Sequence, residues 1–162
     1  MNTTEDPFQK IWTSLLDRID RYGWAVQSVM ATAEAPPYAY SVGMCKLGKP
    51  EVLILGLDYE TSHQLINDIC ERLVQGLATA AHGEVLEQVA NFPLRVCVPP
   101  EGRTDAYALG AQRYAQEFGH EVKVVQVLWP DPEGRFTDDP LCEQHTIWLQ
   151  QLNPQDPRKD LH

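Results

Sequence analysis

Apolar positions at helical spacing mark the first element of the chain. Four of them lie on one face of a helix over 7–22: Ile11, Leu15, Ile19 and Tyr22. Asp6 suits the N-cap, because its side chain can accept a bond from a free backbone N–H, and Gly23 suits the stop. Wider stripes of the same kind predict later helices over 61–81 and 105–118, and one or two helical turns over 146–152.

Runs of β-branched and aromatic residues predict the strands. The densest are YAYSVGM at 38–44 and EVLILGL at 51–57, on either side of a Gly/Lys/Pro turn. Because short turns join neighbouring strands, the sheet should be mainly antiparallel and strongly curved. Strand and helix do not alternate regularly, which excludes a Rossmann-type fold. Further strands are expected over 24–31, 84–89, 92–98 and 121–129.

These elements predict a single α+β domain over residues 1–150. Its curved, mainly antiparallel sheet should be covered by two or three helices, and a split barrel is one form that such a sheet can take. The 162 residues are enough to enclose one core. Residues 151–162 are expected to form a disordered tail.

Alternation along 38–44 suggests where a ligand could approach the sheet. Tyr38 and Tyr40 should point to one face, and the small residues Ala39, Ser41 and Gly43 to the other. A face with few side chains lets another backbone or a flat ligand come close. We therefore expect a pocket bordered by six residues: Tyr38, Tyr40, Ser41, Gly43, Glu51 and Trp129.

Composition and charge narrow the classes of partner. The chain has 13 Lys and Arg against 23 Asp and Glu, a formal net charge of −10, and its basic residues are scattered. Binding to nucleic acid or to an anionic membrane is therefore not expected, since both need a positive surface. No apolar run approaches the ~18 residues of a membrane span, and the polar N-terminus is not a secretory signal. The four cysteines form no CxxC pair, so a reducing cytoplasm is the expected compartment.

Five short motifs occur together in this chain: GW at 23–24, YAYSVGM at 38–44, PE at 50–51, GL at 56–57 and QVLWPDPEGRF at 126–136. As a set they resemble a bacterial family known only as domain of unknown function 4262, over most of residues 10–137. Members of that family often have His before the Pro-Glu pair, where this chain has Lys49. They often have Pro-Trp where it has Thr137-Asp138. The resemblance implies no activity.

A flavin is the cofactor to weigh against a purely structural interpretation of the central strands. An aromatic-Ser-hydrophobic-Gly strand followed by an apolar strand is similar, at the level of fold, to flavin-reductase split barrels. Ser41 could contact a phosphate, and Tyr40 or Trp129 could border the ring system of FMN. A phosphate also needs basic side chains, for which the candidates are Lys46, Lys49, Arg95 and Arg135. The alternative is that the aromatic residues belong to the core.

Other chemistries have weaker signals. The histidines 63, 82, 120 and 145 are widely separated, and no HExxH motif is present, so no metal site is expected. Cys45 beside Lys46 could have a lowered thiol pKa, although it is not expected to be catalytic. Glu51 could meet Asp131 or Arg135 at one end of the sheet, either as a structural contact or as a polar anchor for a ligand.

The function expected from these observations is a non-catalytic module that binds an unidentified small molecule or protein. An acidic face could steer the domain toward a basic partner, as in immunity-type inhibitors. The alternative is a flavin-dependent oxidoreductase of split-barrel type. Free edges of the curved sheet also make a homodimer an expectation.

Overall fold

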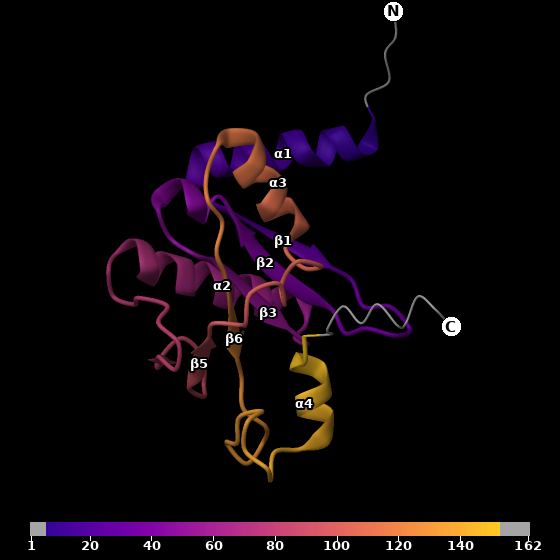
Figure 1. Cartoon of the computed structure of the whole chain (residues 1–162), viewed down its shortest axis with the longest axis vertical. Coiled ribbons are helices and arrows are strands. Elements are labelled where there is room, and N and C mark those ends of the chain that lie inside the picture. Colours follow the sequence, from indigo (N-terminus) through magenta and orange to yellow (C-terminus); the bar gives the residue numbers. More distant parts are fainter. Residues whose placement is uncertain (1–5, 153–162) are drawn as a thin grey trace, which may run out of the picture.

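A computed structural model describes residues 6–152, which form four α-helices, one short 3₁₀ helix and one open six-stranded sheet (Figure 1). The predicted α+β class, with a curved and mainly antiparallel sheet, is confirmed. The sheet is not closed, because two of its strands are edges. The tail expected to be disordered lies, from residue 153 onward, outside the described residues.

The sheet has the strand order β1-β2-β3-β6-β5-β4. Within the described chain, β3 and β6 pair in parallel, with Glu51 beside Val124, and the other neighbours pair antiparallel. The edges are therefore β1 and the very short β4. The strands are β1 (Ala25–Val29), β2 (Tyr38–Val42), β3 (Glu51–Leu55), β4 (Val85–Leu86), β5 (Leu94–Cys97) and β6 (Val124–Leu128).

Three helices cover the sheet and a fourth lies at its end. Helix α2 (Tyr59–Val74) packs on one face, where it joins a core cluster with apolar residues of β3, β5 and β6. Helices α1 (Pro7–Tyr22) and α3 (Leu109–Phe118) pack together on the other face (Figure 1). Helix α4 (Gln144–Gln150) contacts β3. The expectation of two or three covering helices is thus met.

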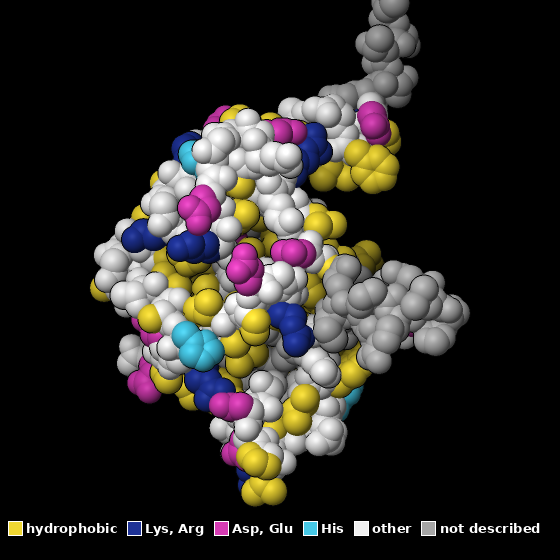
Figure 2. Space-filling model, in the orientation of Figure 1, with side chains coloured by type: hydrophobic (Ala, Val, Ile, Leu, Met, Phe, Trp, Pro, Cys, Tyr) yellow, Lys and Arg dark blue, Asp and Glu magenta, His cyan; other side chains and the backbone are white. Residues whose placement is uncertain are grey.

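The surface is mixed in character. Figure 2 shows acidic, basic and apolar side chains interspersed on the face that it presents, without a field of one sign. None of the helices among residues 6–152 combines the length and the apolar character that crossing a bilayer requires.

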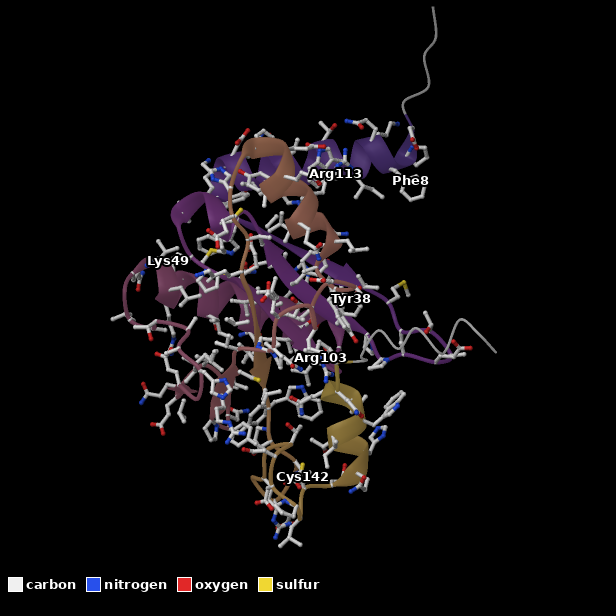
Figure 3. All side chains as sticks on the ribbon, viewed as in Figure 1. Phe8, Tyr38, Lys49, Arg103, Arg113 and Cys142 are labelled. Atoms are coloured by element: carbon white, nitrogen blue, oxygen red, sulfur yellow. The ribbon has the colours of Figure 1, made fainter. Side chains whose placement is uncertain are left out.

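The predicted ends of α1 are confirmed. Asp6 Oδ1 accepts a hydrogen bond from the Phe8 N–H at 3.0 Å, and Gly23 takes the left-handed conformation with φ of 100°. The apolar stripe is shifted from the predicted one, because Trp12 is buried and Ile11 is 53% exposed. The Arg113 guanidinium of α3 lies over the Trp12 ring, 3.9 Å from the ring centroid. Figure 3 shows Arg113 beside α1.

Several other boundaries differ from the prediction because the local backbone begins or ends the element at another residue. Helix α2 begins at Tyr59, where Asp58 accepts a bond from the Thr61 N–H at 3.1 Å, and it ends at Val74 before Gly76. Helix α3 begins at 109 rather than 105, after Ala108 in the left-handed region. Strand β2 ends at Val42, because Gly43 has φ of 107° and turns the chain into the 3₁₀ helix η1 (Met44–Leu47).

Candidate functional site

The Glu51 carboxylate is the polar centre of the predicted pocket. It is fully buried at the start of β3. Oε1 accepts bonds from Ser41 Oγ at 2.7 Å and Met44 N at 3.2 Å, and Oε2 accepts from Gly43 N at 2.9 Å and Cys45 N at 3.3 Å. The carboxylate therefore satisfies three backbone N–H groups at the start of η1, which would otherwise have no partner.

Burial dominates the electrostatics of this cluster. It raises the pKa of Glu51 to about 7, and the hydrogen bonds from Ser41 and the three amides offset only part of that rise. Burial, with the nearby charge of Glu51 as the next cause, also raises the pKa of the Cys45 thiol to about 11. A raised thiol pKa is the opposite of what a cysteine nucleophile needs at neutral pH.

Ser41 and the small face of β2 are occupied by the protein itself. Ser41 Oγ donates to Glu51 and accepts from the Val52 N–H at 2.8 Å, so it holds the β2 and β3 chains together. Ala39 lies in the core cluster that α2 completes. At Gly43, an added Cβ would come within 2.9 Å of Ile19 Cγ2. The space that the sequence suggested for a flat ligand is therefore taken by α2 on one side of the strand and approached by α1 at Gly43.

The two tyrosines of β2 have different surroundings. Tyr40 is 4% exposed, and its hydroxyl accepts a bond from the Gly110 N–H at 3.0 Å, which ties α3 to the sheet. Tyr38 is only half-buried and meets Tyr107 edge-on, with ring centroids 5.0 Å apart. Figure 3 shows Tyr38 near the middle of the molecule, and its side chain borders a hollow described below.

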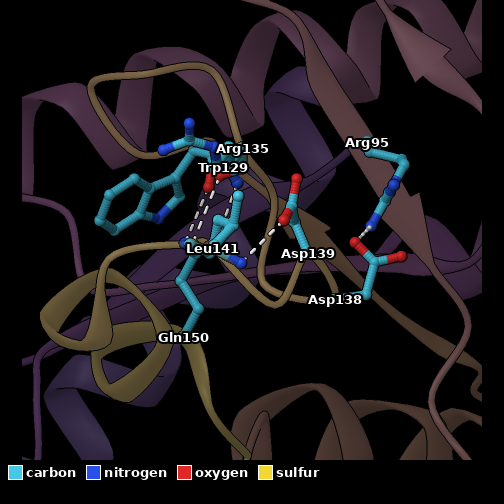
Figure 4. A network of polar contacts seen from close by, with 8 residues as sticks. Arg95, Trp129, Arg135, Asp138, Asp139, Leu141 and Gln150 are labelled. Carbon is cyan, nitrogen blue, oxygen red and sulfur yellow. Dashed lines mark hydrogen bonds and ion pairs between the residues drawn. The ribbon is translucent and has the colours of Figure 1, made fainter.

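Trp129 lies at the far end of the sheet and fixes α4. Its indole Nε1 donates to Leu55 O at 2.8 Å, and its backbone N–H donates to Gln150 Oε1 at 2.8 Å (Figure 4). Gly56, with φ of 88°, leaves no room there, because a Cβ would lie 2.8 Å from Leu149 Cβ. Since β3 and β6 run parallel, Trp129 after the end of β6 is at the opposite end of the sheet from Glu51 at the start of β3.

Asp131 is part of the same distal region. Its Oδ1 accepts from the N–H groups of Glu133 and Arg135, both at 2.9 Å, and its Oδ2 accepts from Glu143 N at 2.9 Å. These bonds, that from Arg135 first, lower the pKa of Asp131. The expected meeting of Asp131 with Glu51 does not occur, and each carboxylate instead fixes its own loop.

Two of the side chains considered for a ligand or a metal ion, Arg95 and His82, have partners within the fold. Arg95 pairs with Asp138 at 2.6 Å (Figure 4) and lies 4.6 Å from the Phe136 ring centroid. His82 Nδ1 accepts from Val98 N at 3.0 Å. Over residues 6–152, no three His, Cys, Asp or Glu side chains gather as a metal ion would need.

Two concave regions remain outside the predicted pocket. A wide cleft of about 910 Å³ lies where the chain enters β3 and β6, with Lys49 and Lys123 on its rim. Three acidic residues share that rim, so it has no dominant charge: Glu101, Asp105 and Glu121. The other region follows the free edge of β1.

We define the β1 groove as two hollows along β1 and α2. The first, of about 480 Å³, lies between the end of α1, the start of β1 and the middle of α2; its lining includes Arg18, Tyr22, Trp24, His63, Asn67 and Glu71. The second, of about 210 Å³, lies at the end of β1 and the start of α2; its lining includes Ser28, Met30, Tyr38, Tyr59 and Ser62. Of the predicted site residues, Tyr38 alone borders either hollow.

The β1 groove holds polar atoms that the fold leaves without partners. Arg18 Nε and Ser28 Oγ are the buried side-chain polar atoms of residues 6–152 that have no hydrogen-bond partner. Arg18 is among the residues that line the first hollow, and Ser28 is among those that line the second. Burial, with Arg18 as a second cause, lowers the pKa of His63. Sequence patterns missed this site, because a lone Arg beside an apolar stripe and a Ser in a strand are common surface features.

Comparison with known proteins places the chain in a family without supplying an activity. No curated protein and no solved structure matched it. The family model described as Domain of unknown function (DUF4262) matches residues 18–143, which is most of the chain and includes all five motifs. The chain therefore belongs to the DUF4262 family.

Proposed function

We propose that this protein is a non-catalytic binding module that holds an extended peptide segment of a partner protein in the β1 groove. The segment adds as a further strand beside β1, and α2 forms the wall against which its side chains pack. This is the strand-addition mode of peptide recognition, in which backbone bonds supply affinity and pockets for alternate side chains supply specificity.

The observation that carries the proposal is the position of Arg18 Nε and Ser28 Oγ. Buried polar groups in folded proteins nearly always have partners, so an unpaired one needs an explanation. The residues that carry these atoms line the β1 groove, from different elements and in different hollows. A ligand that spans the groove would contact both residues, whereas a small molecule in one hollow would contact one of them.

The outer edge of β1 likewise has no partner strand within the described chain. The inner edge pairs with β2 from Ala25 to Val29. Five residues of strand span about 17 Å, which is long enough to hold a peptide of similar length. The opposite edge, β4, has two residues and offers much less.

Exposed apolar side chains border both hollows. Tyr22 is 70% exposed beside the first hollow, and Met30 and Tyr59 are 86% and 64% exposed beside the second. In an extended peptide, side chains two residues apart point to the same side. Alternate residues of the bound segment would therefore face the two hollows in turn and cover these side chains.

The test is selection of binders from a random peptide library on the purified full-length chain, followed by hydrogen exchange. We expect selected peptides to slow amide exchange in Ala25–Val29, because outward-facing N–H groups gain acceptors. Ser28→Arg should abolish binding, since it fills the second hollow and places a charge on the edge. Val85→Arg, on the exposed part of β4, is the matched control and should bind normally.

Three results would overturn the proposal. One is the absence of any enriched peptide. Another is protection at the cleft beside Lys49 and Lys123 instead of at β1. The third is protection of β1 without added peptide, in a protein that elutes as a dimer and becomes monomeric in Ser28→Arg. That result would identify the occupant as a second copy of the chain.

A further inference from the structure

We infer that the β1 groove selects segments that carry a carboxylate, which Arg18, His63 and Asn67 bind in the first hollow. This inference rests on the proposed function and adds the chemistry of the partner. The carboxylate can belong to an Asp or Glu side chain or to the end of a chain, since both present the same two oxygens.

Arg18 is a cation without an anion. The ion pairs among residues 6–152 join Arg21 to Asp17, Arg95 to Asp138 and Arg113 to Glu117, and none involves Arg18. Its Nε is buried and has no acceptor. The neighbouring acid on α1, Asp17, is held by Arg21 at 3.1 Å. A planar guanidinium with free N–H groups matches the two oxygens of a carboxylate.

The acidic residues of the first hollow do not supply that partner. Asp68 and Glu71 border it, but neither forms an ion pair with Arg18. Glu71 accepts instead from Gln75 Nε2 at 2.8 Å. It lies eight residues after His63, which is about 12 Å along the helix axis. We call the part of the hollow beside Arg18 its cationic end; Asp68 and Glu71 follow His63 along α2.

Two further groups supply donors at the cationic end. Burial, and after it the charge of Arg18, lowers the pKa of His63, and the His63 ring stacks on Tyr59 with centroids 4.3 Å apart. Asn67 Oδ1 accepts from Trp24 Nε1 at 3.0 Å, so its amide NH₂ group remains available as a donor. Arginine, imidazole and amide donors around one hollow are the set that a carboxylate needs.

The experiment uses synthetic peptides made from the binders that the library selects. Each is prepared with a free C-terminus, with an amidated C-terminus, and with every Asp or Glu replaced in turn by its amide. We expect one change to weaken binding about 10- to 100-fold, as loss of a charged hydrogen bond does. If amidation is that change, the chain end is bound; if a single Glu→Gln or Asp→Asn is, the side chain is bound.

Arg18→Gln in the protein should have the same effect and should make binding insensitive to that peptide change. Arg21→Gln, on the same helix and exposed, is the control and should bind normally. Peptides that bind the groove equally well in all neutralised forms would overturn the carboxylate inference and leave the proposed function standing. If no peptide binds at β1, both fail. The peptide series needs no protein variant, so it decides the matter even if Arg18→Gln folds poorly.

Discussion

The Glu51 cluster and the β1 groove both hold buried polar groups beside a strand, but they differ in how those groups are satisfied. In the Glu51 cluster each carboxylate oxygen accepts two bonds, and Ser41 both donates and accepts. In the β1 groove, Arg18 Nε and Ser28 Oγ have no partner within the described chain. The first region is complete without a ligand and the second is not.

This difference separates structural from functional polar residues better than residue type does. Glu51, Ser41 and Gly43 are the more suggestive residues in the sequence, because a buried carboxylate beside small residues is typical of a ligand site. Their bonds instead keep η1 closed against the start of β3. Arg18 and Ser28 are unremarkable by type, yet they are left unpaired at a free sheet edge.

The largest expected effect comes from removing the carboxylate of the Glu51 cluster. Glu51→Ala leaves three buried N–H groups and the Ser41 hydroxyl without their acceptor, so the free energy of unfolding should fall by about 3–5 kcal/mol. Urea unfolding followed by circular dichroism measures this. Glu133→Ala, at an exposed position, is the control and should change stability by no more than about 0.5 kcal/mol. A small effect at Glu51 would mean that η1 closes without it.

The next largest expected effect is a change in the stability of the fold with pH. The pKa of Glu51 is raised from 4.5 to about 7 in the folded chain, so the folded state holds its proton more tightly than the unfolded state. The stability that this proton contributes is fully present below about pH 4.5. It is lost as the pH rises through about 7, and amounts to about 3 kcal/mol.

The difference in unfolding free energy between the native chain and Glu51→Gln, followed from pH 4 to pH 8, isolates this contribution, because the amide does not titrate. We expect the native chain to lose stability relative to the variant over that range. A difference that is constant with pH would show that Glu51 keeps an ordinary pKa, and the four hydrogen bonds would then balance the effect of burial.

Much of the fold could be predicted from the sequence, since it depends on local patterns. The caps of α1 at Asp6 and Gly23, the apolar stripe of α2 and the order of strands and helices all follow from spacing and residue type. The errors at the ends of α2 and α3 are also local, because caps at Asp58 and Ala108 were not recognised.

The candidate site could be predicted only in part, because it depends on long-range packing. The parallel pairing of β3 with β6 separates Glu51 from Trp129 and Asp131, and no local pattern specifies that pairing. The spacing of residues predicts the small face of β2, but it does not say that α2 fills that face. Whether Arg18 has an anion nearby is likewise decided by residues far along the chain.

The smallest expected effect is that of Ser→Ala. It tests the comparison between the Glu51 cluster and the β1 groove most directly, because the same substitution is made in both regions. Ser41 and Ser28 lie on the neighbouring strands β2 and β1, so the same Ser→Ala substitution can be made in both. Ser41→Ala leaves the Val52 N–H unpaired and should destabilise the fold by about 2 kcal/mol. Ser28→Ala removes a hydroxyl that has no partner and should stabilise it by about 1 kcal/mol.

Opposite signs in urea unfolding would establish that the two buried serine hydroxyls differ in role, that of Ser41 completing the fold and that of Ser28 being left for a ligand. The same Ser28→Ala protein should bind groove-selected peptides less tightly, since the stability gained comes from a group that the ligand is proposed to satisfy. A loss of stability at Ser28 equal to that at Ser41 would mean that its hydroxyl is already paired in the free protein. The β1 groove would then rest on Arg18 and the free edge of β1 alone.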